Sequence, residues 1–389
     1  MLVAVKQRQR HSMSGYGLSA CGDFSAVFQI CFIDCGSGVA LAIQSKETNM
    51  HVRNRTTLLA LLAAGCLAAS AQQFKLTHSI HIGGTGGWDY LATDSQARRL
   101  YVSHNTEVDV VDLDSERIVG KITGADGVHG IALAPESNRG YISSGRDNKI
   151  LVFDLKTLEV VSSVKAGSNP DGIVYEPAND RVLAFNGHSK DATILDAATG
   201  MTHTIALDGK PEFAVADGNG VVFVNIEDKS EIQKIDVKTL KVESTWPLSP
   251  CESPSGLAID RASRRLFSVC DNKMMAIVNA DSGKVIATPA IGEGPDAAAF
   301  DPQLKVAFSS NGESGTLTVV REQGNDKYGV LETVTTKAGA RTMALDEKTH
   351  KIYLSDAGFG PAPAATADHP HPRRPIEPGS FSVLVVERK

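Results

Sequence analysis

The sequence predicts an all-β chain built from repeated four-stranded units, and three observations carry this prediction. A turn, a polar residue and a small apolar strand recur through most of the 389 residues. The gaps between successive polar positions are regular, at 40, 42, 41, 43, 41 and 45 residues. Each copy also holds short runs rich in β-branched residues, bounded by Gly, Pro, Asn and Asp. A period of about 40–45 residues with several strands per unit is typical of a β-propeller, and seven copies predict seven blades.

The seven polar positions are the reference points of the repeat. Each follows a turn and opens the first strand of its unit. Because the first strand of every propeller blade lines the central channel, we expect these side chains to face one opening. In chain order they are Asp89, His129, Asp171, Glu212, Ser255, Asp296 and Arg341.

The second unit shows how four strands fit into one copy. Alternating β-branched and aromatic residues predict the strands, and Pro, Asn and Asp predict the turns between them. The expected strands are 130–133, 140–143, 149–153 and 160–164. An acid between the third and fourth strands recurs in five units, where we expect it to accept backbone hydrogen bonds in a tight turn. These acids are Asp112, Asp154, Asp196, Asp236 and Asp281.

The two ends of the chain predict how the ring closes. The last unit has strands expected at 342–345, 351–355 and 382–386, and no fourth strand follows. An unpaired strand at about 74–82 precedes the first unit. Its predicted place is the outer edge of the last blade, which removes an open sheet edge. A Pro-rich loop at 357–380 interrupts this blade and is expected at the channel mouth as a cover.

Residues 1–71 lie outside the repeat and are interpreted as a leader. Residues 50–71 have the order of a secretory signal: basic residues, an apolar run and a small-residue cleavage site. The apolar run is too short to span a membrane, so we predict cleavage and export to the periplasm or the exterior. Residues 1–49 are interpreted as a misplaced upstream start, with an unusually long leader as the alternative. Cys66 lies in a weak lipoprotein-type sequence, which leaves lipidation open.

The composition of residues 72–389 limits the partners and cofactors. This part of the chain holds 33 basic and 42 acidic side chains, a net charge of −9, which argues against nucleic-acid binding. It keeps two of the six cysteines, Cys251 and Cys270, which fall on the same rim of one predicted blade. In an exported protein this pair predicts a disulfide, with two buried free thiols as the alternative.

The second strands of several units carry a recognisable motif. Segments 101–104, 141–144 and 353–356 begin with Tyr, an aliphatic residue and Ser, and segments 170–172 and 254–256 have a Pro-x-Gly turn. The units therefore resemble the YVTN-repeat β-propellers, the YncE-like family of exported proteins, over roughly residues 74–389. The resemblance implies a seven-bladed propeller and no single activity. Similar propellers carry haem or a quinone, but the chain has no Cys-x-x-Cys-His attachment sequence, so no such cofactor is expected.

The channel mouth is the predicted binding site, with a second set of side chains contributed by the ends of the second strands. Four carboxylates around one opening repel one another unless a cation offsets them, so the ring suits a cationic or polyhydroxylated ligand, or an ion of the calcium type. The candidate ligand-binding residues are Asp89, His104, His129, Asp171, Asn186, Glu212, Asn225, Asp296 and Arg341.

Three classes of function remain open from the sequence. The first is a monomeric module that binds a small molecule or a protein at the channel mouth. The second is a hydrolase or lyase, lactone-cleaving by analogy of fold, with His129 as a base beside Asp171. The third is an envelope scaffold without a small ligand.

Overall fold

The computed structural model describes residues 21–24, 28–34, 39–45, 73–363 and 374–389. The chain divides into two units, residues 1–71 and 72–389. In the first unit, β1 (Cys21–Phe24), β2 (Phe28–Asp34) and β3 (Val39–Ser45) form an antiparallel sheet in the order β1-β2-β3. The predicted signal sequence at 50–71 lies outside the described residues. No helix in the described part of the chain has the length and apolar character needed to cross a membrane.

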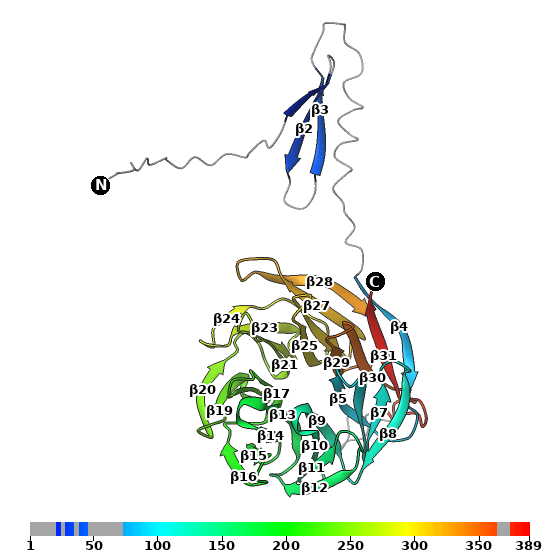
Figure 1. Cartoon of the computed structure of the whole chain (residues 1–389), viewed down its shortest axis with the longest axis vertical. Coiled ribbons are helices and arrows are strands. Elements are labelled where there is room, and N and C mark those ends of the chain that lie inside the picture. The colour runs from blue at the N-terminus through cyan, green and yellow to red at the C-terminus, as the bar shows by residue number, and fades with distance from the viewer. Residues whose placement is uncertain (1–20, 25–27, 35–38, 46–72, 364–373) are drawn as a thin grey trace, which may run out of the picture. The chain divides into compact units, whose positions relative to one another are not determined.

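The second unit confirms the predicted seven-bladed β-propeller, with seven four-stranded antiparallel sheets arranged in a ring (Figure 1). Blades one to three are β5 (Trp88–Asp94), β6 (Arg99–His104), β7 (Glu107–Asp112), β8 (Arg117–Thr123); β9 (Val128–Ala134), β10 (Arg139–Ser144), β11 (Lys149–Asp154), β12 (Val160–Lys165); and β13 (Pro170–Glu176), β14 (Arg181–Asn186), β15 (Asp191–Asp196), β16 (Thr202–Ala206). Blades four and five are β17 (Pro211–Ala216), β18 (Val221–Ile226), β19 (Glu231–Asp236), β20 (Lys241–Pro247); and β21 (Pro254–Asp260), β22 (Arg265–Cys270), β23 (Met274–Asn279), β24 (Val285–Ala287). Blades six and seven are β25 (Pro295–Asp301), β26 (Val306–Asn311), β27 (Thr316–Glu322), β28 (Tyr328–Thr335); and β29 (Met343–Asp346), β30 (Lys351–Asp356), β31 (Ser382–Arg388), β4 (Phe74–His81).

Three short 3-10 helices join first and second strands or second and third strands. They are η1 (Pro135–Ser137), η2 (Pro177–Asn179) and η3 (Glu227–Lys229). The first strands of neighbouring blades lie side by side and surround the channel. The apolar core fills the space between blades: one cluster, for example, joins Tyr101 and Val110 of blade one to Ile142 and Phe153 of blade two. Each blade therefore buries its faces only by packing on its neighbours.

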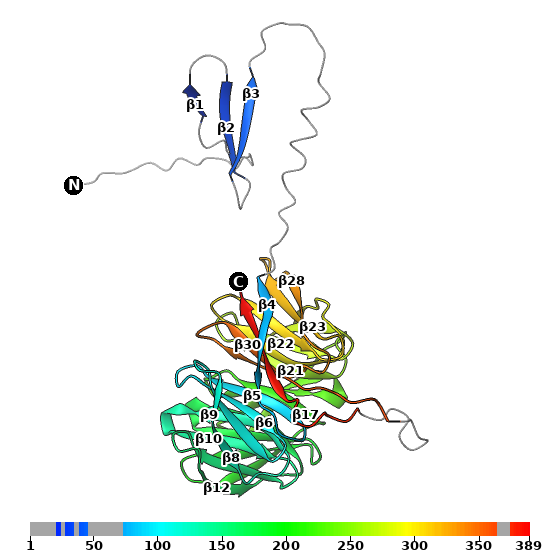
Figure 2. The same cartoon turned by 90° about the vertical axis from the view of Figure 1, so that its right-hand side faces the viewer.

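The ring closes as predicted, through pairing of β4 with β31. The register runs antiparallel from Ser382↔His81 to Arg388↔Phe74, and both views show the two strands together (Figure 2). Phe74 is fully buried and meets Phe308 of blade six edge to face, with ring centroids 5.3 Å apart. The backbone amide of Phe74 also donates to the Glu332 carboxylate at 3.0 Å. The N-terminal strand thus completes blade seven and contacts blade six.

Four of the five predicted turn acids are confirmed, and one is wrong. Asp154 Oδ1, for example, accepts the backbone amides of Lys156 and Thr157 at 2.9 and 3.0 Å. Asp112, Asp196 and Asp236 accept backbone amides in the same way. In blade five, Asn279 does this instead, accepting from Asp281 and Ser282. The acceptor is the last residue of the third strand, and β23 ends at Asn279, so Asp281 lies two positions too late.

The predicted disulfide joins Cys251 and Cys270. Cys251 lies in the turn before β21, Cys270 is the last residue of β22, and both are buried. The bond ties the entry of blade five to its own second strand. Two free thiols are therefore not the arrangement in this structure.

Replacing Phe74 tests the closure of the ring. Phe74→Ala removes a fully buried aromatic side chain between blades six and seven, so we expect the free energy of unfolding to fall by about 3 kcal/mol. Urea unfolding followed by tryptophan fluorescence measures the change. The exposed neighbour provides the control, because Lys75→Ala is expected to change stability little. Equal stabilities of the two variants would contradict the role of this strand.

The disulfide gives a second stability prediction. We expect the double variant C251S/C270S to lose about 2–4 kcal/mol relative to the oxidised protein, because the cross-link restricts the unfolded chain. A reductant should bring the wild-type protein to the same stability and leave the variant unchanged. A wild-type protein that does not respond to complete reduction, checked by thiol titration, would contradict this prediction.

Candidate functional site

A bulge at the start of the first strand aims each of six ring residues into the channel. In blades one to six the pairing of first and second strands shifts register, so that two residues of the first strand face one of the second. In blade one these two residues are Asp89 and Tyr90, which lie between the pairs Trp88↔His104 and Leu91↔Val102. A bulge of this kind turns a side chain out of the regular alternation. The repeat in the sequence therefore reflects a repeated backbone irregularity.

Serine hydroxyls opposite the bulges connect neighbouring blades. Ser143 Oγ accepts the backbone amide of Gly130 at 2.7 Å and donates to the backbone carbonyl of Asp171 in the next blade. Ser310 Oγ makes the equivalent bond to the carbonyl of Arg341. The Ser of the Tyr-Val-Ser-type motif thus holds the backbone of the next ring residue in place.

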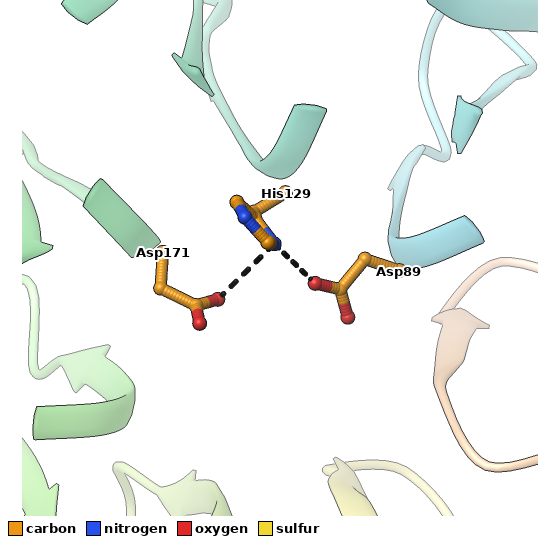
Figure 3. Close-up of side chains that lie close together, drawn as sticks. All are labelled: Asp89, His129 and Asp171. Carbon is orange, nitrogen blue, oxygen red and sulfur yellow. Dashed lines mark hydrogen bonds and ion pairs between the residues drawn. The ribbon is translucent and has the colours of Figure 1, made fainter. Parts of the chain in front are cut away.

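His129, Asp89 and Asp171 converge from three adjacent blades (Figure 3). His129 Nδ1 lies 2.6 Å from Asp89 Oδ2 and 3.8 Å from Asp171 Oδ1. The predicted partnership with Asp171 therefore needs a correction, since the acid that hydrogen-bonds the imidazole is Asp89. Burial lowers the pKa of His129, but the hydrogen bond to Asp89 and the charge of Asp171 outweigh it and raise the pKa overall.

Gly145 leaves the space that the imidazole occupies. A Cβ atom at this position would lie 2.6 Å from His129 Nε2, which is too close for any side chain. With Nε2 placed against Gly145, the ring presents Nδ1 to the two acids. Gly145 directly follows β10, the second strand of blade two, and therefore helps to orient His129.

Arg341 and Asp296 form the opposite side of the ring. Arg341 Nη1 lies 3.1 Å from Asp296 Oδ2, and Nη2 lies 4.0 Å from Asp89 Oδ1. Ser255 Oγ donates to Asp296 Oδ1 at 3.0 Å. Burial and the charge of Asp89 raise the pKa of Asp296, although Arg341 and Ser255 act against this shift. Ring residues of blades five, six, seven and one are therefore linked.

Glu212 and Asp171 carry the least compensated negative charge. Lys210 Nζ lies 2.6 Å from Glu212 Oε1 and 2.5 Å from Glu227 Oε2. Burial and the charge of Asp171 nevertheless raise the pKa of Glu212 to about 8. Burial and the charge of Asp89 raise the pKa of Asp171 to about 6. One lysine shared between two carboxylates does not neutralise this part of the ring.

Two aromatic side chains, Tyr90 and Phe213, extend from opposite sides of the channel and meet. Their ring centroids are 4.4 Å apart. The Tyr90 hydroxyl is buried and has no hydrogen-bond partner among the residues that the structure describes. Burial raises its pKa well above the usual value, and the charges of Asp171, Glu212, Asp89 and Asp296 add to this effect. The phenol therefore lies close to all four ring carboxylates.

The sequence reasoning missed Tyr90, Phe213 and Lys210. The sequence does contain a signal for the two aromatic residues. Both occupy the position directly after the ring residue of their blade. The other five copies have a small residue at this position: Gly130, Gly172, Gly256, Ala297 and Thr342. Two large aromatics in an otherwise small series mark a place where side chains fill the channel.

Of the remaining candidates, His104 lies within blade one, away from the ring contacts. Its Nδ1 lies 2.9 Å from Asp109 Oδ2, and the side chain is 3% exposed. Its imidazole packs on Phe381, which also stacks on Trp88 with ring centroids 5.3 Å apart. Trp88 therefore serves in packing.

The two predicted asparagines are also fully buried. Asn186 Nδ2 donates to Asp191 Oδ1 at 2.6 Å and to Thr193 Oγ1 at 3.0 Å, within its own blade. Asn225 Nδ2 donates to the backbone carbonyl of Ser255 at 2.9 Å. The structure thus gives Asn225 a supporting role for a ring residue, and contact of either asparagine with a ligand stays a prediction.

The comparisons with known proteins are informative about the fold alone. No protein-family model matches the sequence, and no curated protein matches it. Among solved structures, Kuenenia stuttgartiensis hydrazine synthase is similar with a TM-score of 0.61 and 14% identity, over 69% of this chain and 92% of that chain. A structure of U3-55K has a TM-score of 0.65 and 9% identity, over 82% of this chain and 99% of that one. Likeness at this level of identity carries no function across.

The buried charge of Glu212 gives a pH prediction. The pKa of this carboxyl is 4.5 in an unfolded chain and about 8 in the folded chain, so the folded chain binds the proton more tightly. The protonated carboxyl therefore contributes its full stability below pH 4.5, and this contribution is lost as the pH rises to about 8. Glu212→Gln removes this loss. We therefore expect the variant to exceed the wild type by about 2 kcal/mol at pH 8.5 and to equal it at pH 4.

Urea unfolding at the two pH values measures this difference. Glu227→Gln is the matched control, because Glu227 shares Lys210 but is not a ring residue. The control should show no gain at pH 8.5. A Glu212→Gln variant less stable than the wild type at pH 8.5 would show that its ion pair with Lys210 outweighs the burial of charge.

Proposed function

We propose that this protein is a binding module that takes a cationic ligand at the mouth of its channel. The observation that carries the proposal is the convergence of four ring carboxylates on one opening with too little positive charge beside them. Burial and the charges of neighbouring carboxylates raise the pKa values of Asp171, Glu212 and Asp296, which shows that ionised carboxylates are disfavoured there without a cation. A bound cation offsets this repulsion and favours the ionised carboxylates.

The aromatic pair supports the same proposal. Tyr90 and Phe213 supply apolar ring surface close to the acids, and the Tyr90 hydroxyl has no hydrogen-bond partner among the described residues. Carboxylates above an aromatic surface suit an organic ammonium group, which gains from both the charge and the ring faces. A metal cation is the other ligand with the required charge.

We also propose that the protein is exported, belongs to the YncE-like family and acts as a monomer. Residues 50–71 have the order of a signal peptide, and the Cys251–Cys270 disulfide suits an oxidising compartment. The motif with Tyr, an aliphatic residue and Ser supports the family. Its Ser has a structural reason here, which is the bond from Ser143 to the next blade.

A hydrolase is the second candidate, favoured by the pair of His129 and Asp89. The separation of 2.6 Å between Nδ1 and Oδ2 is that of a base held by an orienting acid. Hydrolysis of an ester or lactone that is lost in His129→Gln and kept in Glu227→Gln would favour this candidate. A scaffold without a small ligand predicts neither hydrolysis nor cation binding.

Cation binding is tested by calorimetric titration of the purified full chain at pH 8 and low ionic strength. The panel is putrescine, choline, calcium, manganese and zinc ions. We expect at least one to bind with a 1:1 stoichiometry. The double variant E212Q/D296N should weaken that binding by at least about tenfold, because it removes two ring charges.

The matched control for this titration is the double variant E227Q/D114N. It removes two acids outside the ring, so it carries the same change in net charge and should bind like the wild type. Absence of binding by every cation of the panel would overturn the proposal. Equal losses in both double variants would overturn it too, because they would reflect net charge and not the ring.

A further inference from the structure

Asp89, His129 and Asp171 place one nitrogen and two carboxylate oxygens around a common space at the channel mouth (Figure 3). These three atoms all lie within 4.8 Å of one another. A metal ion with bonds of about 2.0–2.2 Å bridges ligand atoms up to about 4.4 Å apart. The separation of 3.8 Å between His129 Nδ1 and Asp171 Oδ1 falls within this span. The contact of 2.6 Å between Nδ1 and Asp89 Oδ2 is a hydrogen bond, which an ion bound at Nδ1 would replace.

We propose that Asp89, His129 and Asp171 form a binding site for a divalent transition-metal ion. This inference rests on the proposed cation-binding function and narrows the class of ligand from cations in general to a divalent metal ion. The three side chains come from blades one, two and three, so the site depends on the packing of three adjacent blades and not on one flexible loop. Three protein ligands leave coordination positions open for water or a ligand in the channel.

The chemistry of the ligand set favours a transition metal over calcium. Calcium takes oxygen ligands, six to eight of them as a rule, whereas this group contains an imidazole nitrogen and two carboxylates. A mixed nitrogen and oxygen set suits zinc, manganese, cobalt or iron. The ring of acids alone suggested an ion of the calcium type. The imidazole makes a transition-metal ion the better fit.

The residues around the three ligands hold them in place. Gly145 lies against His129 Nε2 and leaves Nδ1 as the atom presented to the acids. Arg341 Nη2 approaches the second carboxylate oxygen of Asp89 at 4.0 Å, and Ser103 Oγ accepts the Asp89 backbone amide at 2.9 Å. Outer contacts of this kind orient metal ligands.

The Tyr90 hydroxyl is a second polar group of the channel that points to a ligand. It is buried without a hydrogen-bond partner among the described residues. Its oxygen lies 3.5 Å from the position of a Cβ atom built on Gly172, the residue next to Asp171. The hydroxyl thus lies against the backbone next to Asp171, where a water or ligand atom in the channel can satisfy it.

A second group with metal-ligating residues is already satisfied. His104, Glu107 and Asp109 also bring three ligand atoms within 4.8 Å. Lys121 Nζ, however, lies 2.6 Å from Glu107 Oε1 and 3.1 Å from Asp109 Oδ1. The ammonium group supplies the positive charge there, so this group serves as the control site.

The test is a cobalt titration of the full chain after treatment with a chelator. Co²⁺ bound to nitrogen and oxygen ligands gives visible absorption bands, and displacement by Zn²⁺ removes them. We expect one Co²⁺ per chain. His129→Gln and Asp171→Asn should each weaken its binding by at least about tenfold, and Glu107→Gln should leave it unchanged. Unfolding midpoints of all variants, measured without metal, confirm that they are folded.

The outcomes separate this inference from the proposed function. Choline and putrescine are titrated in parallel. If an ammonium ligand binds and Co²⁺ does not, the metal site is wrong and the cation-binding function stands. If neither Co²⁺ nor any cation of the earlier panel binds, both are wrong. Loss of Co²⁺ binding in Glu107→Gln, or full binding in His129→Gln, would place the metal elsewhere and overturn the inference.

Discussion

The antiparallel pairing of β4 with β31 is the interaction on which the rest of the propeller depends. Blades bury their apolar faces against one another, so an incomplete last blade leaves an unpaired edge and an exposed face. The pairing joins residues more than 300 positions apart and brings blade seven against blade one. Closure is also what carries Arg341 to within 4.0 Å of Asp89.

The closed ring brings charged side chains that recur along the chain together at the channel mouth. Ring residues lie about 41 positions apart in the sequence, yet one side-chain atom each of Asp89, His129 and Asp171 lies within 4.8 Å of the other two. Each is aimed by a bulge, and a serine holds the backbone of the Asp171 bulge across the blade boundary. Because this backbone frame is the same in most blades, the side chain at each position changes without loss of the fold.

Sequence reasoning located the ring and the closing strand, because both follow from the period of the repeat, and it located the disulfide from the two cysteines that the repeat places on one rim. It did not predict the hydrogen-bond partners of individual side chains. His129 bonds to Asp89 and not to Asp171, and Gly145, in the turn after β10, leaves the space that the imidazole occupies. His104 was expected beside the ring, but Asp109 holds it within its own blade. Such choices depend on local distances that a repeat does not encode.

The sequence by itself determined the blade number, the order of strands and the identity of the seven ring residues, because periodic hydrophobic strands and turns are local features. Only the tertiary structure decided which ring residues pair, and that Tyr90 and Phe213 meet across the channel. It also decided which carboxyl groups have raised pKa values, since burial and charge repulsion depend on the distances between groups from different blades. These distances exist only after the seven blades have closed around one axis.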